Sequence, residues 1–233
     1  MFSNEQSNIY YSFEREEIYM AKTKTETMEC RTTIVRSVDQ KSIYEFTNEY
    51  GFDGKKALVI TLSSESYNTP TFFDRTKYFT FINLSRIGYS KITMYNLFTK
   101  IGEKLKPASY TNDDIDESLK YLKKLLNQGY DSIVIAMGTT MSKNRRVKEC
   151  KKLLFELLLP YHKEGKVVRI VDDMELYNHD EEQCLHPLYA GNYIGGRWKL
   201  IPYDIETVMN KIDEELKPKE IQEVSPTLEE AGE

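Results

Sequence analysis

Four mainly apolar runs, each about as long as a strand, recur through the centre of the chain and constrain its fold. They lie at residues 56–62, 91–98, 131–137 and 166–171. Runs of this kind are typical of strands that are buried on both faces of a parallel sheet. Their alternation with helical segments predicts an α/β fold, in which a mostly parallel sheet with right-handed crossovers is flanked by helices.

Helical periodicity separates these runs. It predicts helices at residues 72–87, 112–127 and 142–159, and a further helix at residues 204–217 after the last strand. We expect Pro160 to end the third helix, because proline lacks an amide hydrogen and clashes with the preceding turn.

Residues 31–203 are expected to form a single α/β domain. Its first part, residues 31–50, contains two alternating runs, which predict an N-terminal antiparallel extension of the sheet. Residues 1–30 show no clear period and predict a flexible or loosely packed extension, with a short helix as one option. Residues 218–233 are acidic and poor in large apolar side chains, which favours a disordered tail.

The sequence also limits the compartment. No apolar run approaches the roughly 20 residues needed to span a bilayer. The first residues lack the basic and apolar regions of a secretory signal. The three cysteines are an odd and sparse set, typical of a reducing environment. We therefore expect a cytoplasmic protein with no membrane partner.

Charge is distributed unevenly within a formal net charge of −5. Residues 51–203 carry 23 basic and 18 acidic side chains, whereas residues 204–233 carry 3 and 10. The mildly basic centre is compatible with a nucleic acid or nucleotide as partner. An ordinary solvated surface is the alternative interpretation. A protein partner could also bind through the N-terminal segment or the acidic tail.

Common catalytic signatures are absent from the sequence. It has no GxxxxGK[ST] phosphate loop, no GxGxxG after the first strand and no GxSxG elbow. In open α/β sheets, ligands bind beyond the carboxyl ends of the strands. This rule places the candidate site in the loops at residues 63–71, 96–106, 138–143 and 172–197.

The side chains in these loops allow functional and purely structural interpretations. Glu65 is a general base or a solvated loop acid. Asn96 contacts a ligand or bonds loop backbone, and Asp74 has a functional role or is a helix cap. His186 contacts a ligand or bonds a backbone carbonyl as a structural histidine.

Two further groups of residues could form an anion site or a metal site. The basic residues at 143–146 would hold an anion at a helix N-terminus, or form a solvated helix face. His179, Cys184 and His186 lie close in sequence, but their spacing matches no standard zinc pattern. We expect no metal and no cofactor.

Five sequence blocks, taken together, resemble the bacterial family catalogued as domain of unknown function 1643. The blocks are VITLSSESYN, Asp74 with Thr76, NLSRIGYSKITMYNLF, IVIAMG and HPLYAG, within about residues 31–203. The family pattern has Asn-Pro where this chain has Ser63 and Ser64, and Trp where it has Met137. The family name implies no activity.

A more distant resemblance is to the uracil-DNA glycosylase-like superfamily, which implies a three-layer α/β sandwich. It implies Glu65 and His186 as catalytic residues. It further implies a substrate-binding set: Ser63, Ser64, Asn68, Asp74, Asn96, Gly138, Lys143, Arg145, Arg146 and Tyr189.

The resemblance assigns a role to each part of this set. The turn after the first core strand would activate water through Glu65 or Asn68. Asn96 would read a base edge, because an amide both donates and accepts hydrogen bonds. His186 would stabilise charge as the glycosidic bond breaks, and the basic residues would hold phosphates.

These observations predict a nucleobase- or nucleic-acid-recognising protein with a glycosylase-like pocket. If it is an enzyme, the reaction is N-glycosidic hydrolysis of a base flipped out of DNA. The alternative is a non-catalytic nucleotide-binding or protein-interaction module on the same fold. The changed turn at Ser63 and Ser64 favours this alternative.

Overall fold

The four apolar runs form four neighbouring parallel strands in the computed structural model. They are β3 (Lys55–Ser63), β4 (Tyr89–Phe98), β5 (Ser132–Ile135) and β6 (Val167–Asp172), in the spatial order β4-β3-β5-β6. The structure describes residues 29–51, 53–63, 73–101, 104–176, 180 and 183–217. Of the extension predicted at residues 1–30, only Glu29 and Cys30 are described, and Cys30 is the first residue of β1. The acidic tail predicted at residues 218–233 lies outside the described residues.

Strand register explains why these runs are apolar throughout. Val59 lies opposite Met94 and Val134, and all three belong to the core on one face of the sheet. The adjacent Leu58 and Ile133, which also lie opposite each other, belong to the core on the other face. Both faces are therefore covered, as the sequence predicts.

Antiparallel strands complete the sheet at both edges. β1 (Cys30–Arg36) and β2 (Ile43–Tyr50) form the predicted antiparallel extension, and β2 pairs antiparallel with β4. At the other edge, β7 (Trp198–Pro202) pairs antiparallel with β6. The seven-stranded order is β1-β2-β4-β3-β5-β6-β7.

The prediction of a mostly parallel sheet is therefore wrong, because the sheet is mixed. The antiparallel strands β1 and β2 join the parallel strands as part of one sheet. β7 was not predicted at all. It is a short edge strand whose central residues are only partly buried, so it lacks the continuous apolar run that marks β3 to β6.

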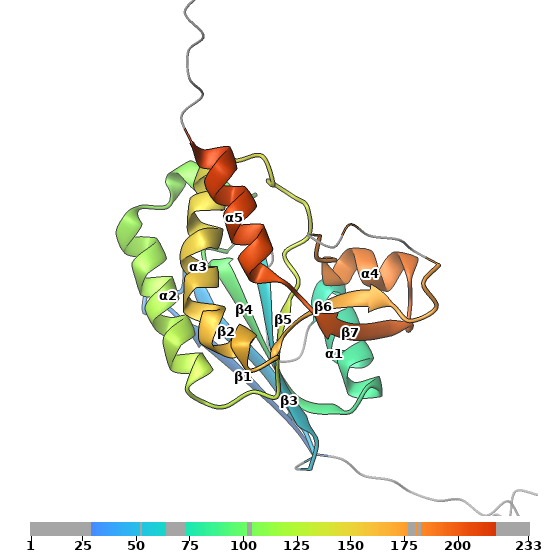
Figure 1. Cartoon of the computed structure of the whole chain (residues 1–233). Coiled ribbons are helices and arrows are strands. Elements are labelled where there is room, and N and C mark those ends of the chain that lie inside the picture. Colours follow the sequence, from blue (N-terminus) through green and yellow to red (C-terminus); the bar gives the residue numbers. More distant parts are fainter. Residues whose placement is uncertain are drawn as a thin grey trace, which may run out of the picture.

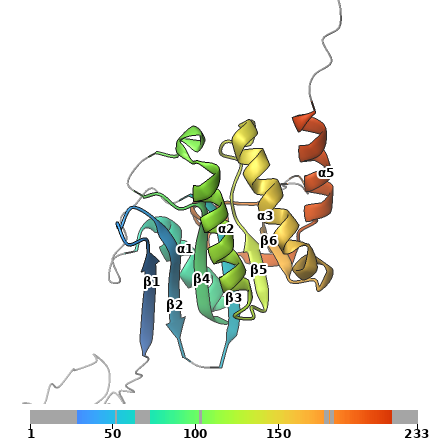
Figure 2. The ribbon, with the colours of Figure 1, turned by 90° about the vertical axis from the view of Figure 1, so that its left-hand side faces the viewer.

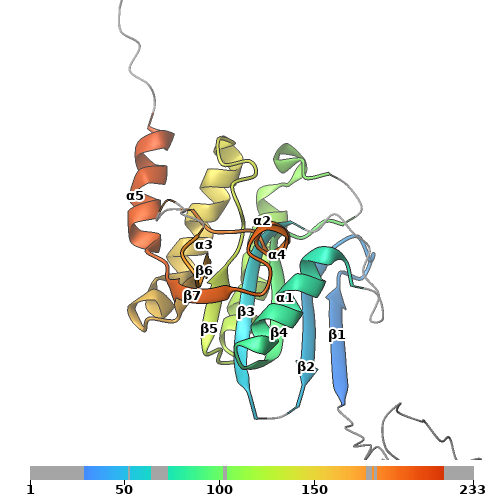
Figure 3. The same cartoon turned by 90° about the vertical axis from the view of Figure 1, so that its right-hand side faces the viewer.

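Helices cover both faces of the sheet. α2 (Asn112–Leu126), α3 (Arg145–Lys163) and α5 (Ile205–Leu216) lie on one face (Figures 1 and 2). α1 (Arg75–Arg86) and α4 (Pro187–Tyr193) lie on the other (Figure 3). A single 3-10 turn, Pro107–Ser109, precedes α2. None of the helices in the described part of the chain is long and apolar enough to cross a membrane.

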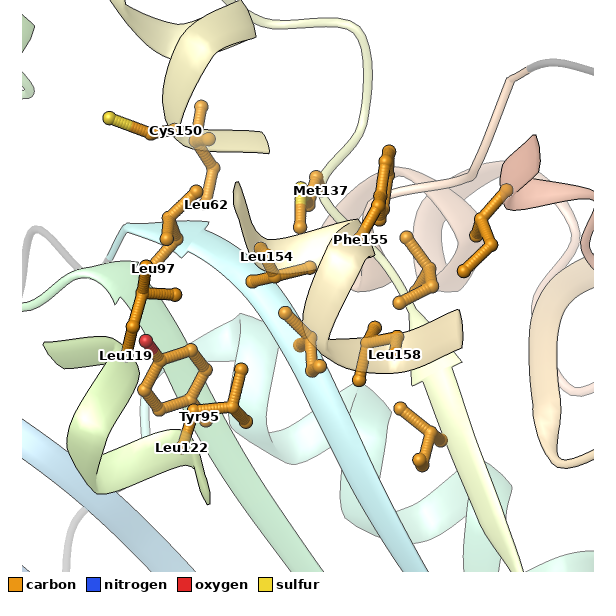
Figure 4. Close-up of a cluster of buried hydrophobic side chains, with 14 of the residues drawn as sticks. Leu62, Tyr95, Leu97, Leu119, Leu122, Met137, Cys150, Leu154, Phe155 and Leu158 are labelled. Atoms are coloured by element: carbon orange, nitrogen blue, oxygen red, sulfur yellow. The ribbon is translucent and has the colours of Figure 1, made fainter. Parts of the chain in front are cut away.

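The larger core lies between the sheet and the α2, α3 and α5 layer. Figure 4 shows Leu154, Phe155 and Leu158 of α3 in one cluster with Leu62 of β3 and Tyr95 and Leu97 of β4. Tyr95 is fully buried there, and its hydroxyl lies 2.7 Å from the Ser118 hydroxyl of α2. This polar contact satisfies the buried phenol without opening the core.

α3 does not end at Pro160, contrary to the sequence-based prediction. Proline loses one helical hydrogen bond, but Tyr161 in the following turn packs against the large core and holds the helix together. The helix ends at Lys163, before Gly165, whose φ of +71° suits glycine. α4 is a further difference, because it lies within residues 172–197, where the sequence predicts a loop.

Candidate functional site

A cavity of about 490 Å³ opens beyond the carboxyl ends of β3 and β4, where the topology rule places a ligand. The ends of these strands, β2, the loop after β5, and the first turns of α1 and α4 contribute to its lining. Its polar lining residues are Thr61, Ser63, Asp74, Arg75, Thr76, Lys77, Asn96, Lys104, Thr140, His186 and Asn192. The rest of its lining is apolar and includes Phe46, Leu62, Met94 and Met137.

Asn96 and Thr61 lie opposite each other on β4 and β3. Both side chains are buried, and the Thr61 hydroxyl donates to the Asn96 amide oxygen at 2.5 Å. This contact orients the amide. It leaves the Asn96 Nδ2 hydrogens for an acceptor in the cavity and one lone pair on Oδ1 for a donor.

A buried ion pair forms another part of the wall. Asp74 caps α1 by accepting from the Lys77 backbone amide at 2.9 Å. The second carboxylate oxygen lies 2.7 Å from Lys77 Nζ, and Lys77 is only 4% exposed. Burial lowers the pKa of Lys77, and the Asp74 carboxylate opposes this shift. The cation also lies 5.3 Å from the centre of the Phe46 ring.

His186 is held in one tautomer by the start of α4. It is the N-cap residue, and its Nδ1 accepts from the Leu188 backbone amide at 3.3 Å. Burial lowers the pKa of His186 below 6.5, an effect that Asp74 opposes. A neutral imidazole that accepts at Nδ1 carries its proton on Nε2. The side chain therefore offers a neutral N–H donor at the cavity.

Gly138 positions His186. Its φ is +66°, a conformation that favours glycine. A β-carbon built at this position would lie 2.9 Å from the His186 β-carbon. Only a residue without a side chain lets the loop after β5 approach the histidine so closely.

The structure brings together several of the predicted site residues. Ser63, Asp74, Asn96 and His186 line the same cavity, although they come from four separate parts of the chain. Tyr189 lines a neighbouring cavity that shares His186 with the first. The predicted residues Ser64, Glu65 and Asn68 lie outside the described residues.

The basic residues near 143–146 do not line this cavity. Lys143 is exposed before α3. Arg145 pairs with Glu149, Nε to Oε1 at 3.0 Å. Arg146 donates to the Asn112 side-chain oxygen at 2.7 Å. The cations at the cavity come instead from residues 75, 77 and 104.

Sequence reasoning missed Lys77, Thr61 and Asn192. A lysine on a predicted helix ordinarily lies on a solvated face, so nothing in the sequence indicates that Lys77 is buried against Asp74. Asn192 accepts from Arg75 at 2.6 Å across the α1–α4 contact, which requires the unpredicted α4. Within the described ranges, no cluster of three His, Cys, Asp or Glu side chains could hold a metal ion, and His179 falls outside those ranges.

Comparison with known families adds to this picture. A family model described as "Protein of unknown function (DUF1643)" matches residues 44–188. The chain belongs to this family. The DUF1643 match begins in β2 and ends in the first turn of α4, so it includes Asn96, Gly138 and His186. β7 and α5 lie beyond the DUF1643 match, and no curated protein matches the chain.

Proposed function

We propose that the cavity binds a nucleobase, carried by a nucleotide or by a nucleic acid. One observation carries this proposal: Asn96 and His186 line the same cavity. The amide offers donors and an acceptor, and the neutral imidazole offers a donor. This combination suits the edge of a base, which presents carbonyl and ring-nitrogen acceptors beside N–H donors.

The shape and lining of the cavity support the same ligand. A volume of about 490 Å³ lies within the usual range for small-molecule sites. Phe46, Met94 and Met137 give it apolar walls on which a flat ring can pack. The cavity sets polar side chains beside these apolar walls, and polar groups in such a setting fix the orientation of a bound heterocycle.

The enzymatic form of this function is hydrolysis of an N-glycosidic bond, by analogy with the uracil-DNA glycosylase-like superfamily. Water would form the new C1′–O bond as the C1′–N bond breaks, and the base would leave with the bonding electrons. His186 would donate from Nε2 to the base carbonyl on which that charge collects. Glu65 would accept the proton that the water loses, or Asn68 would orient the water and the proton would pass to solvent. Both residues follow Ser63 in the sequence.

A non-catalytic base-binding module is the second candidate, and one observation favours it. Asp74 is the one carboxylate among the described residues that line the cavity. It already caps α1 and pairs with Lys77. A carboxylate used in this way is a poor general base, because its lone pairs are occupied and its charge is stabilised.

Base release and base binding distinguish the two forms. Single- and double-stranded oligonucleotides that carry uracil, hypoxanthine or alkylated bases would be incubated with the protein and probed for abasic sites. Binding to the same strands would be measured in parallel. Release supports the enzyme, and binding without release supports the module. If the protein shows no release and no binding, the proposed nucleobase site is overturned.

Variants locate the activity within the cavity. Asn96→Asp keeps the size of the side chain and replaces the amide donors with a carboxylate, and we expect at least about tenfold weaker binding. His186→Asn keeps an oxygen that can cap α4 but removes the imidazole. Asn127→Asp is the matched control, because Asn127 is exposed at the end of α2.

A further inference from the structure

Two more cavities adjoin the proposed base site. One, of about 620 Å³, shares Thr140, His186, Leu188 and Asn192 with it and is also lined by tyrosines of α4. The other, of about 650 Å³, shares Ser63, Lys104 and Leu105. The central cavity therefore has a neighbour on the α4 side and another on the side of residues 99–110. A ligand that occupied all three would have to be long.

The α4 side presents a pair of adjacent aromatic rings, tilted by 31° to each other. Tyr189 and Tyr193 are one helical turn apart, and their ring centres are 4.2 Å from each other. They are 37% and 58% exposed. Large aromatic side chains that stay exposed beside a polar cavity are a common platform for base stacking.

The opposite side is rich in lysine. Lys41, Lys100, Lys104 and Lys106 line this cavity together with the carboxylates of Asp39, Asp114 and Glu117. Lys100 Nζ lies 2.9 Å from the Asp114 carboxylate. Lys104 belongs to the lining of both this cavity and the central one. It is therefore placed to meet a phosphate attached to a ligand in the central cavity.

We infer that the natural ligand is a single-stranded nucleic acid and not a free nucleotide. One base occupies the central cavity, an adjacent base stacks on the Tyr189–Tyr193 pair, and the backbone passes Lys104. This inference rests on the proposed function, because it assigns the base in the central cavity to that site. A single strand is favoured because the edges that Asn96 and His186 would bond are paired in a duplex, so a duplex would bind only after a base has been unpaired and flipped out.

The test compares ligands that carry the same base but increase in length. Affinities would be measured for deoxyuridine and uridine monophosphates, for the matching dinucleotides, and for eight-residue DNA and RNA strands, single and paired. We expect the single strands to bind more tightly than the monophosphates and the duplexes. The DNA and RNA arms identify which backbone the protein takes.

Tyrosine variants test the stacking platform. The combined change Tyr189→Ala and Tyr193→Ala should weaken strand binding roughly fivefold to 100-fold, a larger factor than its effect on monophosphate binding. The corresponding Phe changes keep the rings and should bind like the wild type. Tyr78→Ala is the matched control, because Tyr78 is 52% exposed on α1 and lines none of the three cavities.

A lysine variant tests the backbone contact. Lys104→Gln should weaken binding of the strands and make their binding less dependent on salt. A thermal unfolding curve for each variant checks that the fold is retained.

The outcomes separate the two proposals. Equal affinity for monophosphate and strand, unchanged by the tyrosine variants but weakened by Asn96→Asp, would overturn the single-strand inference and leave the base site standing. If the tyrosine variants lower the affinity for the strands but Asn96→Asp does not, the proposed base site is overturned, together with the bound arrangement that depends on it. No binding of any of these ligands would overturn both.

Discussion

Gly138 and His186 approach each other so closely that a β-carbon on the glycine would meet the β-carbon of the histidine at 2.9 Å. The contact joins the loop after β5 to the start of α4. The position of the imidazole thus depends on a glycine 48 residues earlier in the chain. This dependence can be measured.

Gly138→Ala should lower the free energy of unfolding by about 2–4 kcal/mol, as seen in urea denaturation. About 1–2 kcal/mol comes from the left-handed backbone, and the remainder from the contact with His186. Gly165→Ala is the control, because it has a φ of +71° and no atom within 4 Å of the added β-carbon. Equal losses in the two variants would show that the histidine moves aside without cost.

Gly191→Ala should destabilise the protein although alanine is the better helix former. The added β-carbon would lie 2.1 Å from the Phe79 ring, where α4 packs on α1. Overpacking of this kind costs about 1–3 kcal/mol. Adding Phe79→Leu should recover part of the loss, and the coupling is read from a double-mutant cycle of urea unfolding. Strictly additive effects would argue against the contact.

Asp74→Asn should cost about 3 kcal/mol, because it leaves the buried Lys77 cation without its counter-charge. Asparagine still caps a helix, so the loss of charge is isolated from the loss of the cap. Combining it with Lys77→Met should return the free energy of unfolding most of the way to the wild-type value. A double variant as unstable as Asp74→Asn alone would mean that the unpaired Lys77 charge is not the source of the loss.

His186 should make stability depend on pH in a defined direction. Its pKa is lowered by burial below the unfolded value of about 6.5, so the unfolded state binds more protons between the two pKa values. Its contribution is therefore complete above about pH 6.5 and is lost as the pH falls towards and through the folded pKa. Urea unfolding from pH 5 to 8 should show this loss in the wild type, and a smaller one in His186→Asn. Parallel pH profiles would rule out a role for His186.

The parallel centre of the fold could be predicted because its signal is local. Each of β3, β4, β5 and β6 contains a mainly apolar run, and burial on both faces is the physical reason. The same topology predicts that the candidate site lies beyond the carboxyl ends of these strands. It also makes Asn96, near the end of β4, a candidate residue of that site. His186 was found through a glycine-rich loop and a family resemblance.

What could not be predicted depends on contacts between distant parts of the chain. Gly191 disfavours a helix in isolation, yet α4 forms because it packs on α1. The burial of Lys77 depends on Phe46 of β2, which is 31 residues away. Neither relationship leaves a periodic trace in the sequence.

The pairing of β2 with β4 has a consequence for shortened forms of the protein. β2 covers the edge of β4 and also gives the central cavity two of its lining residues, Ile43 and Phe46. A chain beginning at Gly51 would expose a row of unpaired backbone groups along β4, a template for intermolecular strand addition. Removing the residues before Gly51 would thus open the cavity and also promote aggregation. The solubility of a shortened protein would therefore indicate whether its cavity is still complete.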